Sequence, residues 1–91
     1  MCWTWDPNKA AANLAKHRVS FETAKLVFDD PLQLSKEDPD PDGDRWQTVG
    51  RVGPVTLLVV HTDPEGDEDG RIISARRATA HERKAYEEEN L

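Results

Sequence analysis

The segment Val55–Thr62, which reads Val-Thr-Leu-Leu-Val-Val-His-Thr, limits the possible folds more than any other part of the chain. Its apolar residues would fall on both faces of a strand, which is typical of a central strand covered on each side. Strand-like segments flank it at Arg45–Val52 and Arg71–Arg76, beyond a Gly-Pro pair and an acidic turn over 63–70. We therefore predict a three-stranded antiparallel meander with helices packed on at least one face.

Helices and a short strand are predicted before this meander. Trp3-Thr4-Trp5 alternates like a strand, and Asp6 followed by Pro7 predicts a helix over Pro7–His17 whose polar side includes Asn13. Ser20 can cap a second helix of about two turns that ends at the Asp-Asp-Pro sequence of residues 29–31. A half-buried strand is expected at Leu32–Ser35.

A capping box predicts the last helix. Thr79 is followed three residues later by Glu82, so the helix should begin at Ala80 and run to about Glu89. The strand before it ends in the adjacent arginines Arg76 and Arg77. Guanidinium groups bind phosphate oxygens in a bidentate manner, so this junction is either a phosphate site or a pair of solvated arginines.

Composition and charge narrow the class of protein. The 91 residues predict a single domain over 1–91, and the formal net charge of −6 argues at first against a nucleic-acid partner. However, the acids are concentrated in 29–44 and 63–70, and the remaining residues together carry +5. A basic surface on the framework is therefore possible, although acidic loops are also commonly just solvated.

The sequence also predicts the cellular compartment of the protein. No apolar run is long enough to span a bilayer, and the first residues lack the pattern of a secretion signal. The single cysteine cannot form an internal disulfide. We expect a cytoplasmic protein without a membrane segment.

The order of these elements and several motifs resemble the BrnT toxins of type II toxin–antitoxin systems. The resemblance covers essentially the whole chain. Its marks are Trp5-Asp6-Pro7-Asn8-Lys9, Asn13-Leu14-Ala15-Lys16-His17, Val19-Ser20-Phe21-Glu22, Val27-Phe28-Asp29-Asp30-Pro31, Gly50-Arg51, Val59-Val60-His61-Thr62, and Arg71 to Thr79 with Glu82, Arg83 and Tyr86.

The resemblance implies an α+β fold of the RelE-like type, with a twisted antiparallel sheet, two N-terminal helices on one face and a C-terminal helix closing one end. It implies an endoribonuclease that cleaves RNA and halts translation. It further implies a BrnA-like antitoxin with a ribbon-helix-helix domain, through which the pair would contact operator DNA and repress its own operon.

One residue departs from the family pattern. Arg18 stands where the family usually has glycine after the Lys16-His17 pair. Either Arg18 adopts the left-handed conformation, at a cost on the order of 1 kcal/mol, or the connection runs differently. The extra charge could also widen a basic rim.

RNA cleavage without a metal needs a base, cations beside the phosphate and an acid. We expect Arg76 and Arg77 to bind the scissile phosphate, with Arg51 assisting and His61 carrying the proton. Arg76 and Arg77 point to opposite faces if the strand stays regular. His81 and Tyr86 rank lower. Flanking phosphates would be held by Lys9, Lys16, His17 and Arg83.

Two other interpretations compete with this one. A metal enzyme is disfavoured because no two histidines have helical i, i+4 spacing and no Cys-x-x-Cys motif exists, so we expect no metal and no cofactor. A non-catalytic module is the stronger rival, with a basic face that docks an acidic helix of a partner in an autoregulatory complex.

Overall fold

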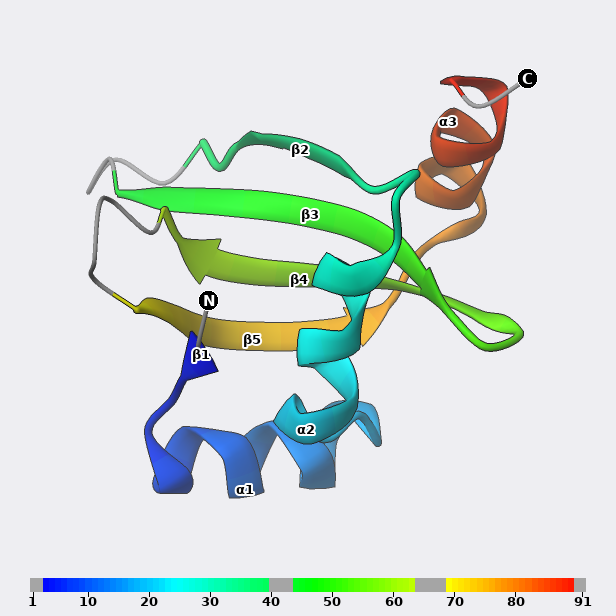
Figure 1. Ribbon diagram of the computed structural model, residues 1–91. Coiled ribbons are helices and arrows are strands. Elements are labelled where there is room, and N and C mark those ends of the chain that lie inside the picture. The colour runs from blue at the N-terminus through cyan, green and yellow to red at the C-terminus, as the bar shows by residue number, and fades with distance from the viewer. Residues whose placement is uncertain (1–2, 40–43, 64–68, 90–91) are drawn as a thin grey trace.

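A computed structural model describes residues 3–39, 44–63 and 69–89 of the chain (Figure 1). It is an α+β structure with a five-stranded mixed sheet and three α-helices within those ranges. Its elements in chain order are β1 (Trp3–Thr4), α1 (Pro7–His17), α2 (Phe21–Ala24), the 3-10 helix η1 (Lys25–Asp29), β2 (Leu34–Glu37), β3 (Arg45–Val52), β4 (Val55–Thr62), β5 (Gly70–Arg77) and α3 (Ala80–Glu89).

The predicted meander is confirmed. The strands lie in the order β1-β5-β4-β3-β2, and β2 through β5 are joined by antiparallel pairings. Gly53, with φ of +59°, allows the tight β3–β4 turn. None of the described helices has the length and apolar character that crossing a bilayer requires.

The prediction of a purely antiparallel sheet is wrong at one edge, because β1 pairs with β5 in parallel. Trp3 lies beside Gly70 in the register, and Thr4 Oγ1 donates a hydrogen bond to the Gly70 carbonyl at 3.3 Å. The Trp3 ring occupies the space that a side chain at position 70 would need. A glycine there lets the start of the chain lie against β5.

Helix α1 has the predicted bounds and caps. Asp6 accepts a hydrogen bond from the Asn8 amide at 2.8 Å, and Pro7 begins the first turn. Arg18 ends the helix in the left-handed conformation with φ of 61°, and its amide donates to the Leu14 carbonyl at 2.9 Å. Of the alternatives for this position, the chain adopts the strained one.

The sequence pattern predicted Asn13 on the polar side of α1, and this is wrong. The residue is buried, with 7% of its surface exposed. Its amide nitrogen donates to the carbonyls of Val19 (3.0 Å) and Ala75 (2.8 Å), and its oxygen accepts from the Ala75 amide (3.1 Å). The amide group thus hydrogen-bonds the β5 backbone beyond the short pairing with β1. Apolar periodicity could not reveal this, because the buried residue is polar.

The second predicted helix is shorter and tighter than expected. Ser20 caps it through the Thr23 amide at 3.1 Å, but α2 continues as the 3-10 helix η1. Phe21, Ala24 and Val27 are fully buried at a spacing of three, which matches 3-10 geometry. A turn at Asp30, which accepts from the Leu32 amide, then delays β2 to Leu34.

The two faces of the sheet have different coverings. On the face that we call the α1 face, α1, α2 and η1 pack on β3 and β5. The core there consists of Val19, Phe21, Ala24, Val27, Leu57, Val59, Ile72 and Ala75. The opposite face, which we call the α3 face, presents Val49 and Leu58 toward α3. Trp3 and Trp5 are partly buried and pack against this core.

Candidate functional site

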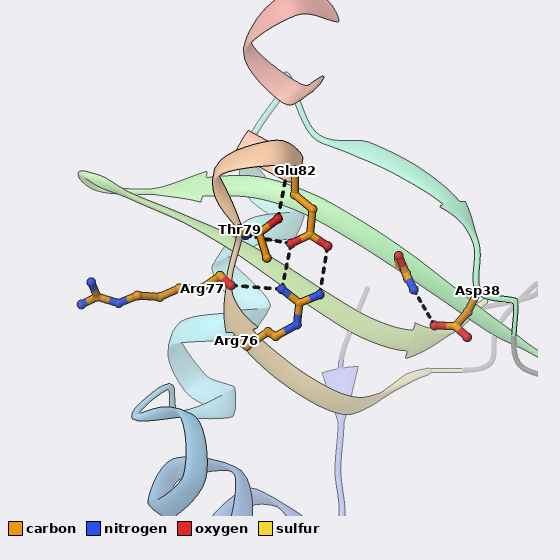
Figure 2. A network of polar contacts seen from close by, with 6 residues as sticks. Asp38, Arg76, Arg77, Thr79 and Glu82 are labelled. Atoms are coloured by element: carbon orange, nitrogen blue, oxygen red, sulfur yellow. Dashed lines mark hydrogen bonds and ion pairs between the residues drawn. The ribbon is translucent and has the colours of Figure 1, made fainter. Parts of the chain in front are cut away.

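The strand-to-helix junction is built around the predicted capping box. Thr79 Oγ1 accepts from the Glu82 amide at 3.1 Å, and Glu82 accepts from the Thr79 amide at 2.8 Å. Glu82 also binds Arg76 with both carboxylate oxygens, at 2.7 and 2.9 Å (Figure 2). The Arg76 hydrogen bonds lower the pKa of Glu82 to about 2, and Glu82 in turn raises that of Arg76.

The bonds of Arg76 leave one edge of its guanidinium available. Nη1 donates to Glu82 and to the Arg77 carbonyl at 3.2 Å, and Nη2 donates to the second Glu82 oxygen. Nε and the outer hydrogen of Nη2 have no acceptor among the described residues, and the side chain is 36% exposed. Two parallel N–H donors on one edge are the arrangement that binds a phosphate in bidentate fashion.

Arg77 lies on the other face of the sheet. In the β4–β5 register Arg76 stands opposite Leu58, whereas Arg77 stands opposite Leu57 in the α1-face core. Figure 2 shows the Arg77 side chain extending away from Arg76 and Glu82. The register is regular from Ser74 to Arg77, so the two arginines point to opposite faces and do not share a site.

A groove of about 350 Å³ lies between α3 and strands β2 and β3 on the α3 face; we call it the α3 groove. Val49 and Leu58 contribute to its apolar lining, and Gln47 donates a 2.8 Å hydrogen bond to Asp38. The complete lining is Leu34, Ser35, Lys36, Gln47, Val49, Leu58, His81, Glu82, Ala85, Tyr86 and Glu89. Glu82 connects this groove to Arg76.

His61 does not line that groove. It is buried on the α1 face, with 5% of its surface exposed. Nδ1 donates to the Thr62 carbonyl at 2.8 Å, so Nε2 of the neutral ring accepts from the Thr48 hydroxyl at 2.6 Å. The rings of Trp3 and Phe28 meet the imidazole edge-on at 5.1 and 4.8 Å. Burial also lowers the pKa of His61. These contacts and this burial are typical of a structural histidine.

Arg51 is part of a third region. Its amide donates to Asp30 Oδ2 at 2.8 Å, and Tyr86 donates to the same oxygen at 2.6 Å. Burial raises the pKa of Asp30, but these bonds and the one from Leu32 lower it further than burial raises it. Arg51 lines a shallow depression of about 520 Å³ that shares Tyr86 with the α3 groove. Asp30 thus ties α3 to β3.

The four residues expected to hold flanking phosphates are spread over two helices. Lys9, Lys16 and His17 belong to α1, which packs against the opposite face from α3, whereas Arg83 belongs to α3. Lys9, Lys16 and Arg83 are exposed and His17 is half-buried. Across the described ranges, no three histidine, cysteine or acidic side chains gather as a metal site would require.

The α3 groove contains residues that sequence patterns do not single out. His81 ranked below His61, yet it is exposed on the first turn of α3 and lines the groove. Lys36 and Gln47 belong to no motif that predicts binding, but they pair in the β2–β3 register. Strand alternation did place Gln47 on the face of Val49 and Arg51, and that was the available signal.

Comparisons with known proteins bear on the family of this chain. A search of curated proteins finds no match to this sequence. The family model described as "Ribonuclease toxin, BrnT, of type II toxin-antitoxin system" matches residues 5–82, which include strands β2 to β5, the helices before them and the start of α3. The chain therefore belongs to the BrnT family of ribonuclease toxins of type II toxin–antitoxin systems.

Proposed function

We propose that this chain is a metal-independent endoribonuclease of RelE-like fold that cleaves RNA in the α3 groove and thereby blocks translation. In this proposal a BrnA-like ribbon-helix-helix antitoxin neutralises it, and the pair contacts operator DNA through the antitoxin. The observation that carries the catalytic part is the available Nε–Nη2 edge of Arg76, held by Glu82 at the margin of a groove that also contains His81.

Arg76 is proposed to bind the scissile phosphate. When the 2′-hydroxyl attacks phosphorus, negative charge grows on the phosphate oxygens, and a fixed guanidinium stabilises it. Glu82 acts as a positioning residue, because its two bonds hold the guanidinium plane and its pKa of about 2 keeps it ionised. A preformed donor edge needs little reorganisation when the transition state forms.

His81 is proposed to carry the proton from the attacking 2′-oxygen to the leaving 5′-oxygen. Histidine suits proton transfer near neutral pH, and this one is exposed in the groove. Lys36 and Gln47 supply donors for neighbouring phosphates or base edges. The proposed centre uses neither His61, which is buried, nor Arg51 and Arg77, which line other regions.

Expression in a bacterial host tests the proposal. We expect the parent to arrest growth and degrade RNA, and the product of the neighbouring open reading frame to restore growth. His81→Ala and Arg76→Lys should lower cleavage by the purified protein by about 10²-fold, since proton transfer and bidentate binding are lost. Cleavage by the parent should persist in EDTA.

Lys84→Ala is the matched control, because Lys84 is 75% exposed and makes only a 3.8 Å ion pair with Glu88. It should cleave RNA like the parent. If folded His81→Ala and Arg76→Lys were as active as the parent, the α3 groove would not be the catalytic centre. A folded parent that neither arrests growth nor degrades RNA would favour the non-catalytic partner-binding module.

A further inference from the structure

A second groove lies on the opposite side of the sheet from the proposed catalytic centre. It has a volume of about 240 Å³ where the end of α1 meets the β3–β4 turn and the end of β5. Two arginines line it, and we call it the Arg18–Arg77 groove. Its lining is Leu14, Arg18, Val19, Ser20, Thr23, Val52, Val55, Leu57 and Arg77.

Arg18 enters this groove from a strained backbone position. Its φ of 61° is a conformation that glycine adopts freely and that costs an arginine on the order of 1 kcal/mol. The side chain makes no hydrogen bond to any described residue that would offset the strain. The backbone position ends α1, since the Arg18 amide donates to the Leu14 carbonyl, but this cap does not need an arginine side chain and glycine would form it without the strain.

The guanidinium groups of Arg18 and Arg77 are both exposed, and neither has a carboxylate partner in the described parts of the chain. Lys16 and His17 add basic groups in the last turn of α1. Nearby, the Ser20 hydroxyl donates to Thr23 at 2.9 Å. This rim is therefore positive on a protein whose net charge is −6, and it is complementary to an acidic ligand.

The side chains at the floor of the groove favour an acidic peptide over single-stranded RNA as its ligand. Single-stranded RNA is usually held by aromatic rings that stack on its bases, and no aromatic side chain is among the described lining residues. Instead the lining is aliphatic, and Leu14 stays 48% exposed at its surface. An aliphatic floor with a basic rim fits a peptide segment that has apolar anchors and flanking carboxylates.

We propose that the Arg18–Arg77 groove binds an acidic, amphipathic segment of the antitoxin, which inserts aliphatic side chains between the two arginines. This inference rests on the toxin–antitoxin pairing in the proposed function. It assigns the adjacent arginines to different surfaces, with Arg76 serving RNA and Arg77 serving the partner. The antitoxin would then hold the toxin by the face opposite the α3 groove.

Arg18→Gly is the sharpest test, because it removes a guanidinium and relieves the strained backbone at once. The probe is the purified product of the neighbouring open reading frame, titrated against the full-length chain by calorimetry. We expect Arg18→Gly to weaken this binding about tenfold, although the variant melts at a higher temperature than the parent. Arg77→Gln should weaken binding by a similar factor, and Lys84→Ala should leave it unchanged.

Unchanged affinity in Arg18→Gly would overturn the inference. So would weaker binding of a non-cleavable 2′-O-methyl RNA with antitoxin affinity retained, which would make the groove a nucleic-acid site. RNA cleavage by Arg18→Gly, measured separately, distinguishes the two proposals. Parent-like cleavage with parent-like antitoxin affinity refutes only this inference, whereas weakened affinity in a chain that never cleaves RNA refutes only the ribonuclease.

Discussion

At the scale of single residues, Asn13 makes the strongest prediction about stability. Asn13→Ala would leave the Ala75 amide and the carbonyls of Val19 and Ala75 buried without those partners. We expect the free energy of unfolding to fall by about 3 kcal/mol, since each buried unpaired group is costly. Urea denaturation measures this loss. Asn8→Ala, an exposed change on the same helix, is the matched control, and an equal effect in both would contradict the assignment.

His61 predicts a dependence of stability on pH. Burial lowers its pKa in the folded protein below the ordinary 6.5. Below pH 6.5 the imidazole is therefore protonated in the unfolded chain more readily than in the folded protein. The unfolding free energy of the parent should therefore fall as pH drops from 6.5 toward the lowered folded pKa. His61→Phe keeps a ring beside Trp3 and Phe28 but cannot titrate, and its stability should lack this component. Matching pH profiles of parent and variant would refute the prediction.

At the scale of elements, the start of α3 depends on an ionised carboxylate. The folded pKa of Glu82 is about 2 against an ordinary 4.5, so its contribution is complete above 4.5 and is lost as pH falls toward 2. Glu82→Gln should be less stable than the parent at neutral pH, and the difference should shrink over that window. Thermal melting at several pH values measures it. Glu87→Gln, an exposed change on the same helix, should show no such convergence.

The attachment of α3 to the sheet makes a second prediction at this scale. Tyr86→Phe removes the 2.6 Å bond to Asp30, while Asp30 keeps the amides of Arg51 and Leu32. We expect a loss of about 1 kcal/mol, concentrated in α3. Hydrogen exchange should then be faster over residues 80–89 and unchanged in α1. Uniform acceleration across the chain would instead indicate global destabilisation.

At the scale of the whole molecule, the sequence predicted correctly those features that depend on contacts between residues close together in the chain. The cap at Asp6 and the capping box formed by Thr79 and Glu82 predicted where α1 and α3 begin. Contacts between distant segments were not readable in the same way. The parallel pairing of β1, the burial of Asn13 and the environment of His61 all depend on residues more than ten positions away.

The candidate site shows the same division. Alternation along β5 correctly set Arg76 and Arg77 on opposite faces, as the register confirms. Which guanidinium would be held in a fixed orientation depended on Glu82 reaching back to Arg76, and which histidine would be exposed depended on how Trp3 and Phe28 pack. The resemblance to BrnT toxins indicated the class of protein, and the structure supplied the geometry on which the catalytic proposal rests.

Two polar side chains hydrogen-bond the backbone of β5 and β3 where these strands lack a neighbouring strand, and this affects self-association. Asn13 already engages the outward backbone groups of β5 at Ala75, and Asp30 engages that of β3 at Arg51. A second copy that tried to extend the sheet at either position would first have to displace a polar side chain from its hydrogen bonds. At these two positions, a toxin released from its antitoxin would therefore resist extension of its sheet by a second copy.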